Sequence, residues 1–243
     1  MTRGRATRLA GGAAALASAW WLAGCAQPVR ATASLPSLEV LSSRPAGADD
    51  RLRASDVEPL AASAARWAVA GKGGSFEVRT APSDGGVTRS DNRGERSLCA
   101  GPDGAVSLRW QRDRADGART SFDPPLLLAP PVLEADAPVS ADSAVRTERA
   151  GVADHDNGSA LREVRIASVD RIRTPLGEFE AVRVDAVLTM KVPFASMRRE
   201  SSAWIRKGTG PVALRSDERI LVMGVVPRNT SETRVLLPAG AAP

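Results

Sequence analysis

Apolar and polar residues alternate over much of the chain beyond about residue 100, as they do in strands that bury one face. Within 106–111, Val, Leu and Trp alternate with Ser, Arg and Gln. Within 164–173, Val164, Ile166 and Ile172 share one parity and three arginines share the other. Asp-Gly and Asn-Gly pairs between such runs predict tight turns. The pattern predicts a mainly β fold, a curved antiparallel sheet that forms an open half-barrel or a β-sandwich.

Four local patterns add detail to this prediction. Apolar residues at helical spacing predict one short N-terminal helix over Val57–Trp67. Within 179–192 the apolar residues change parity after Ala181, which predicts a β-bulge. Ile220–Val226 is apolar on both parities and predicts a central strand covered on both faces. The Pro-rich stretch Asp123–Pro131 predicts an irregular connection.

Composition divides the chain into four parts. Residues 1–24 carry the features of a signal peptide, and residues 25–55, rich in Ala, Ser, Pro, Arg and Asp, predict a flexible tether. Residues 56–237 contain the strand patterns and predict a single β-rich domain. Residues 238–243 predict a frayed tail.

The N-terminus has the layout of an export signal. Three arginines and no acid precede the 15-residue apolar segment Leu9–Ala23, which is short for a membrane span. It ends in Leu22-Ala23-Gly24-Cys25, which resembles the lipobox of bacterial lipoproteins. The resemblance implies cleavage between Gly24 and Cys25, with a diacylglyceryl thioether and a further acyl group such as palmitate on Cys25. The alternatives are a plain secretory signal and an uncleaved anchor.

The resemblance also implies a location and a partner. Cys25 would tether the folded part to a membrane, since two or more acyl chains hold a protein durably. Ala26 after the cysteine is similar to the sorting pattern for the outer membrane of a Gram-negative envelope, where the domain would face the periplasm. With Cys25 alkylated, Cys99 has no intramolecular partner, so no disulfide is expected.

Charge and composition exclude several classes of function. Removal of residues 1–24 takes 33 basic residues to 30 against 28 acids, a balance of +2 in place of the formal +5. So small an excess does not indicate a nucleic-acid-binding surface. The single His and two Cys leave little material for catalysis or for a zinc site.

One cluster has ligand character, the Asp154-His155-Asp156-Asn157-Gly158 segment. Its glycine comes one place early for a calcium loop, and no second His exists to complete a zinc site. A solvated turn is the favoured interpretation. We therefore expect no enzyme activity, no catalytic residues, no metal and no cofactor.

The second half of the chain resembles a group of bacterial envelope β-domains. The shared features are Phe122-Asp123-Pro124-Pro125, the hairpin Thr174-Pro175-Leu176-Gly177-Glu178-Phe179 and Trp204-Ile205-Arg206-Lys207-Gly208-Thr209-Gly210. Such domains look like the open barrels of lipoprotein-localisation factors, which hold acyl chains in an apolar concavity. The resemblance implies that the domain binds a lipid-like ligand. This implication rests on similarity of fold alone.

The leading hypothesis is a non-enzymatic, lipid-anchored envelope protein that binds a lipid-like ligand or an envelope protein on its sheet. It predicts an apolar lining formed by Val182, Val184, Leu188, Ile220 and Val222. One alternative is a structural or assembly role without a ligand, through the sheet edges or the Arg-rich outer face. Another is a hydrolase that uses Asp154, His155 and Asp156.

Overall fold

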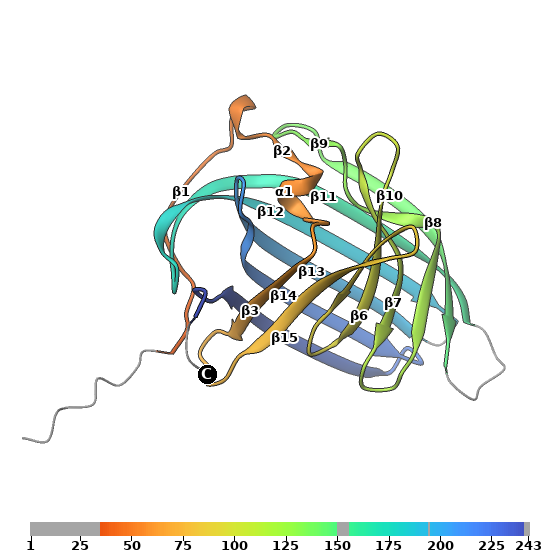
Figure 1. Ribbon diagram of the computed structural model, residues 1–243. Helices are drawn as coiled ribbons and strands as arrows, with labels where there is room; N and C mark the ends of the chain where they lie inside the picture. The colour runs from red at the N-terminus through yellow and green to blue at the C-terminus, as the bar shows by residue number, and fades with distance from the viewer. Residues whose placement is uncertain (1–34, 150–155, 194, 241–243) are drawn as a thin grey trace, which may run out of the picture. The chain divides into compact units, whose positions relative to one another are not determined.

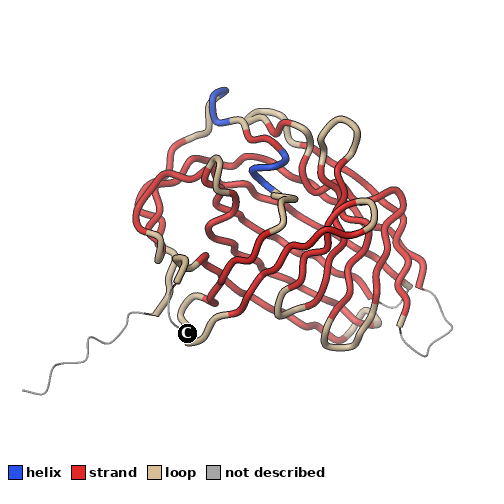
Figure 2. Tube along the Cα trace, viewed as in Figure 1, coloured by secondary structure: helices blue, strands red, loops and turns tan. Residues whose placement is uncertain are grey.

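A computed structural model describes residues 35–149, 156–193 and 195–240 of the chain (Figure 1). Strands dominate these residues, as Figure 2 shows, so the prediction of a mainly β, antiparallel fold is confirmed. The helices are the 3-10 turn η1 (Ala48–Asp50) and the single turn α1 (Ala54–Val57). The strands are β1 (Glu39–Arg44), β2 (Leu52–Arg53), β3 (Ser63–Val69), β4 (Phe76–Ser83), β5 (Gly86–Ser90), β6 (Gly94–Ala100), β7 (Val106–Asp113), β8 (Arg119–Ala129), β9 (Val132–Leu133), β10 (Val139–Glu148), β11 (Asp156–Thr174), β12 (Gly177–Val192), β13 (Ala195–Arg206), β14 (Gly210–Val222) and β15 (Val226–Leu236).

The main sheet closes on itself. Its order is β1-β11-β10-β8-β7-β6-β5-β4-β3-β15-β14-β13-β12, and β12 pairs again with β11. Twelve strands thus form a closed antiparallel barrel, and β1 is an extra strand beside the C-terminal half of β11. The sequence prediction of an open half-barrel or a sandwich is corrected here. Closure depends on β11, whose 19 residues pair with β12 over nearly their whole length and with β10 over their first half.

The barrel is closed most weakly between β3 and β15. Only Arg234, Val235 and Leu236 pair with β3, although β15 is 11 residues long. Side chains from the turn between β5 and β6 reinforce this junction. Arg93 donates to Glu232 at 2.5 Å, and Arg234 donates to Asp91 at 3.1 Å. These ion pairs therefore help to hold β15 in place, since it makes few backbone hydrogen bonds to β3.

Alternation gives the barrel wall an inner and an outer face. The inner face is defined here as the one that carries Val164, Val184 and Ile205, which belong to one buried cluster. Leu52, Ala54 and Val57, from β2 and α1, complete that cluster. The N-terminal segment therefore enters the barrel and fills one part of its interior.

The predicted helix over Val57–Trp67 is wrong in its position and length. α1 ends at Val57, and Ser63–Val69 forms β3, which pairs with β4. Pro59 explains the early end, because a residue before proline is pushed out of the helical region, and Glu58 has a φ of −132° and a ψ of 83°.

Ordered structure also begins earlier than the sequence suggested. The flexible tether expected over residues 25–55 includes β1, η1 and β2. Leu52 is only 1% exposed. Leu52 is held in place because β2 pairs with β9 and because the Leu52 side chain packs in the core.

The parity change in β12 has a different cause from the one predicted. The register irregularity lies in β11, between Ile166 and Ser168, and not in β12. Around Ala181 and Val182 both faces of β12 are buried, because Ala181 belongs to a cluster on the outer face and Val182 to the inner core. Burial on both faces makes both parities apolar.

Ile220–Val226 is not a central strand. β14 ends at Val222, and Met223, Gly224 and Val225 form the turn into β15. The apolar pattern predicted burial on both faces of this segment, but Met223 and Val225 are exposed.

Candidate functional site

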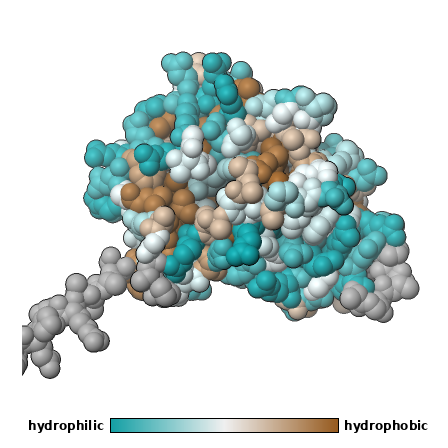
Figure 3. All heavy atoms as spheres, viewed as in Figure 1, coloured by the Kyte–Doolittle hydropathy of each residue, from teal (hydrophilic) through white to brown (hydrophobic). Residues whose placement is uncertain are grey.

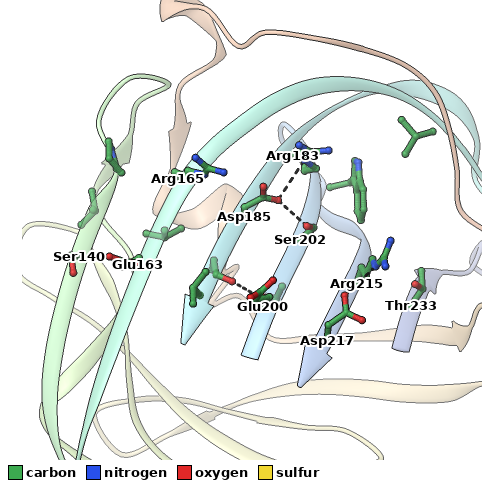
Figure 4. Close-up of a pocket in the computed structure, with 18 of the residues that line it drawn as sticks. Ser140, Glu163, Arg165, Arg183, Asp185, Glu200, Ser202, Arg215, Asp217 and Thr233 are labelled. Carbon is green, nitrogen blue, oxygen red and sulfur yellow. Dashed lines mark hydrogen bonds and ion pairs between the residues drawn. The ribbon is translucent and has the colours of Figure 1, made fainter. Parts of the chain in front are cut away.

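A groove of about 830 Å³ lies on the outer face of the sheet formed by β10 to β15. Figure 4 shows its labelled side chains on one side of the sheet, and these residues belong to strands β10 to β15. Leu38 and Val40 border it from the segment that contains β1. Its volume falls in the range of about 300–1,000 Å³ typical of small-molecule sites.

Cross-strand register assigns the groove to the face opposite the core. Arg183 lies opposite Trp204, Asp185 opposite Ser202, and Val187 opposite Glu200. The intervening residues of β12, among them Val184, point into the barrel. The groove and the core therefore share the same strands and use mostly different side chains; Val164 and Ala186 are the core residues that also border the groove.

The lining combines apolar and charged groups. Leu38, Val40, Val139, Val187 and Trp204 supply apolar surface. The charged residues of the lining are Glu163, Arg165, Arg183, Asp185, Glu200, Arg215 and Asp217. An amphipathic molecule is the class of ligand that such a lining suits.

Most carboxylates of the groove are already paired. Asp185 Oδ1 accepts a hydrogen bond from Ser202 at 2.8 Å and lies 3.4 Å from Arg183 Nε. Asp217 accepts from Ser231 at 2.5 Å and from Arg215 at 3.3 Å. The Ser231 hydrogen bond, followed by the charge of Arg215, holds the pKa of Asp217 below its usual value. Asp217 is therefore ionised at neutral pH and is no proton donor.

A buried carboxylate fixes one end of the groove. The side chain of Asp170 is 0% exposed and accepts hydrogen bonds from Ser43 (2.6 Å), Ser168 (2.6 Å) and Trp204 Nε1 (2.8 Å). Arg183 Nη1 lies 3.7 Å away. Burial raises the pKa of Asp170, but the three hydrogen bonds and Arg183 outweigh burial, so its pKa lies below the usual value. This network ties β1, β11, β12 and β13 together beneath the groove.

An apolar cluster continues from this network along the outer face. Ile172, Ala181, Val212 and Val235 are buried together with Trp204. Leu38, Leu176, Phe179, Leu236 and Leu237 cover them in part. In Figure 3, hydrophobic side chains gather at the left of the view, on the side of the β11–β12 hairpin. The outer face is therefore apolar at this end of the groove and polar along its length.

The structure places the five predicted lining residues on the inner face of the barrel, and not in this groove. Val182 and Val184 are buried against α1. Leu188 packs against a second buried cluster that includes Leu98 and Phe122. Ile220 and Val222, on β14, are half-buried. The sequence thus grouped residues of one face correctly, but the groove belongs to the other.

The inner face also carries charge. Glu58 pairs with Arg89 at 2.5 Å, and Arg89 also donates to the Pro59 carbonyl at 2.6 Å. Burial raises the pKa of Glu58, but the charges of Arg89 and Arg96 outweigh it and leave that pKa below its usual value. Burial lowers the pKa of Arg162 to about 10, and the nearby Arg96 adds to the effect. The charges of Arg89, Arg96 and Arg162 thus all act on Glu58, and Arg96 is also close to Asp91.

Several predicted positions lie outside the described residues. These are Gly24 and Cys25 of the lipobox, and Asp154 and His155 of the candidate ligand cluster. Asp156 is the first residue of β11. Within the described ranges, no group of three or more His, Cys, Asp or Glu side chains is arranged to hold a metal ion. Cys99 is half-buried, and its Sγ lies 3.7 Å from the Ser107 carbonyl.

The sequence did not reveal the groove, because its residues have the pattern of an ordinary solvent-exposed strand face. Arg165, Arg183 and Arg215 all occupy the polar parity of an alternating strand. In the part of the chain that the structure describes, no helix is long and apolar enough to cross a membrane. No protein family model, curated protein or solved structure matches the chain.

Proposed function

We propose that this chain is a lipid-anchored bacterial envelope protein without catalytic activity, which binds a lipid-like ligand in the outer groove. In this proposal Cys25 carries the acyl chains, and the domain faces the periplasm from the outer membrane. The lipobox-like tetrapeptide at Leu22–Cys25 supports the anchor. The groove supports the ligand.

The lining of the groove is the observation that carries the binding proposal. Acyl chains need apolar contact, which Leu38, Val40 and Val187 offer in the groove. A polar head group needs hydrogen-bond donors, which the guanidinium groups of Arg165 and Arg215 offer on the same surface. This position replaces the inner face that the sequence suggested, where α1 fills part of the barrel interior.

The charges of the groove favour binding over catalysis. A general acid or base works best with a pKa near the working pH. Asp217 and Asp170 both have lowered pKa values and remain carboxylates at neutral pH. Their partners, Ser231 for the first and Trp204 for the second, hold them in structural hydrogen bonds.

A charge placed in the groove tests the site. Val187 lies half-buried on the outer face, so Val187→Arg adds a charge to the groove without changing an inner-face residue. Val132→Arg is the matched control, because Val132 is an exposed residue of β9 outside the groove lining. Both variants and the parent are purified from native membranes by one mild extraction, and lipid bound per protein is measured by mass spectrometry. We expect several-fold less lipid on Val187→Arg alone, and equal amounts on all three contradict the proposal.

The anchor is tested separately at Cys25. The intact mass of the parent should carry the diacylglyceryl and acyl groups and lack residues 1–24. Cys25→Ser should abolish the modification, because its hydroxyl forms no thioether. Equal modification and membrane association of the two proteins contradicts the lipoprotein assignment and leaves the groove untouched.

A further inference from the structure

The turn between β14 and β15 exposes large apolar side chains at the end of a hairpin. Met223 is 76% exposed, Val225 75%, Val226 51% and Leu221 37%. These four are half of the large hydrophobic residues that are exposed in the described part of the chain, and all lie within residues 221–226. We call Leu221, Met223, Val225 and Val226 the apolar tip.

The backbone of the turn makes this exposure unusual. Met223 and Gly224 both have positive φ angles, 51° and 71°, and the Val225 amide donates to the Val222 carbonyl at 3.1 Å. This geometry matches a type I′ turn, where Asn-Gly is the preferred pair. Met223 is the only non-glycine residue with a positive φ among the described residues. The chain therefore holds an apolar side chain where a polar one would relieve both strain and exposure.

Cations surround the base of the tip. A cleft of about 370 Å³ beside it is lined by Lys191, Arg198 and Arg219, with Leu221 and Pro227, and contains no carboxylate. Arg198 and Arg219 lie directly opposite each other on β13 and β14. Like charges in that position repel. Arg198 pairs with Glu200 at 2.9 Å, and Arg219 lies close enough to Asp217 for its charge to help lower the pKa of that carboxyl.

We propose that the apolar tip inserts into an anionic phospholipid bilayer, with Lys191, Arg198 and Arg219 bound to the lipid phosphates. Apolar side chains at the end of the hairpin and cations just behind them match the order of acyl chains and head groups at a membrane surface. The tip is too small to form a stable protein interface alone, which buries about 800 Å² on each partner. This surface goes beyond the ligand groove and works independently of it.

Site-specific photo-crosslinking tests the proposal on the full chain. Benzoylphenylalanine replaces Met223 in one protein and Val132, an exposed valine on β9, in a control. Each protein is mixed with vesicles of phosphatidylethanolamine and phosphatidylglycerol, illuminated and digested. We expect phospholipid adducts on the peptide that contains position 223, at least about tenfold above those at position 132.

The charge requirement has its own variant. Each cation close to an anionic surface contributes about fivefold to partition. A variant with Lys191→Gln, Arg198→Gln and Arg219→Gln should therefore lose more than tenfold of the adduct, as should the parent on pure phosphatidylcholine. A Val187→Arg background should leave the adduct unchanged, which separates this surface from the ligand groove. Adducts only to a second protein chain, or equal yields at positions 223 and 132, overturn the proposal.

Discussion

Replacement of Asp170 by alanine removes the acceptor at the centre of the buried network beneath the groove. The carboxylate is fully buried, and its loss leaves Ser43, Ser168 and the Trp204 indole without their shared acceptor. Ser168 and Trp204 are buried, and each buried donor left without an acceptor costs about 1–3 kcal/mol, whereas Ser43 is exposed and can donate to water. Arg183 also loses a carboxylate 3.7 Å away, although it is 33% exposed and keeps Asp185. We expect Asp170→Ala to lower the free energy of unfolding by about 3–5 kcal/mol, the usual cost of breaking a buried charged pair.

Urea unfolding followed by tryptophan fluorescence measures this change, since Trp204 reports directly on the network. The midpoint should fall while the slope of free energy against urea stays constant. Asp217→Ala is the matched control, because Asp217 makes the same kinds of contact but its side chain is 44% exposed, and such pairs contribute less than about 1 kcal/mol. If the two variants unfold at the same urea concentration, the network does not stabilise the fold as argued.

The hydrogen bond from Arg44 holds the pKa of Asp50 at about 2, below the ordinary 3.8. The stability from this carboxylate is therefore complete above 3.8 and is lost as the pH falls towards 2, so Asp50→Asn should flatten that part of an acid-unfolding curve. A side chain at Gly158 would place its Cβ 2.0 Å from a backbone oxygen of β12, whereas Gly73 has open space. Gly158→Ala should therefore lower the melting temperature by several degrees and Gly73→Ala should not; equal melting temperatures refute the close contact. Glu58→Gln removes the ion-pair partner of Arg89 and a compensating charge near Arg96 and Arg162, so we expect a loss of about 3 kcal/mol in urea unfolding that inorganic phosphate partly restores. An unchanged midpoint would show that these charges are solvated.

Much of the fold was visible in the sequence because strands are encoded locally. Alternation at 106–111 and 164–173 predicted parts of β7 and β11. The Thr174–Gly177 segment predicted the turn between β11 and β12, since Pro and Gly occupy the positions where a tight turn needs them. Each of these features depends on residues close together in the chain.

The failures share a different physical origin. Val57–Trp67 has helical spacing, but β4 pairs with residues 63–67 and Pro59 ends the helix. Ile220–Val226 is as apolar as a buried strand, yet the chain reverses within it at Met223 and Gly224. An apolar run indicates that a segment is unfavourable in water, but it does not indicate which neighbouring segment covers it.

Which residues share a face of a strand follows from the order of amino acids alone, because side chains alternate with a period of two whatever the strand pairs with. It also contains the whole lipobox-like motif, which is contiguous. Three further features depend on the folded arrangement: β11 joins β10 to β12, α1 fills part of the barrel interior, and the groove lies on the outer face. Those outcomes depend on contacts between segments far apart in the chain, and no local pattern specifies which strand edge meets which.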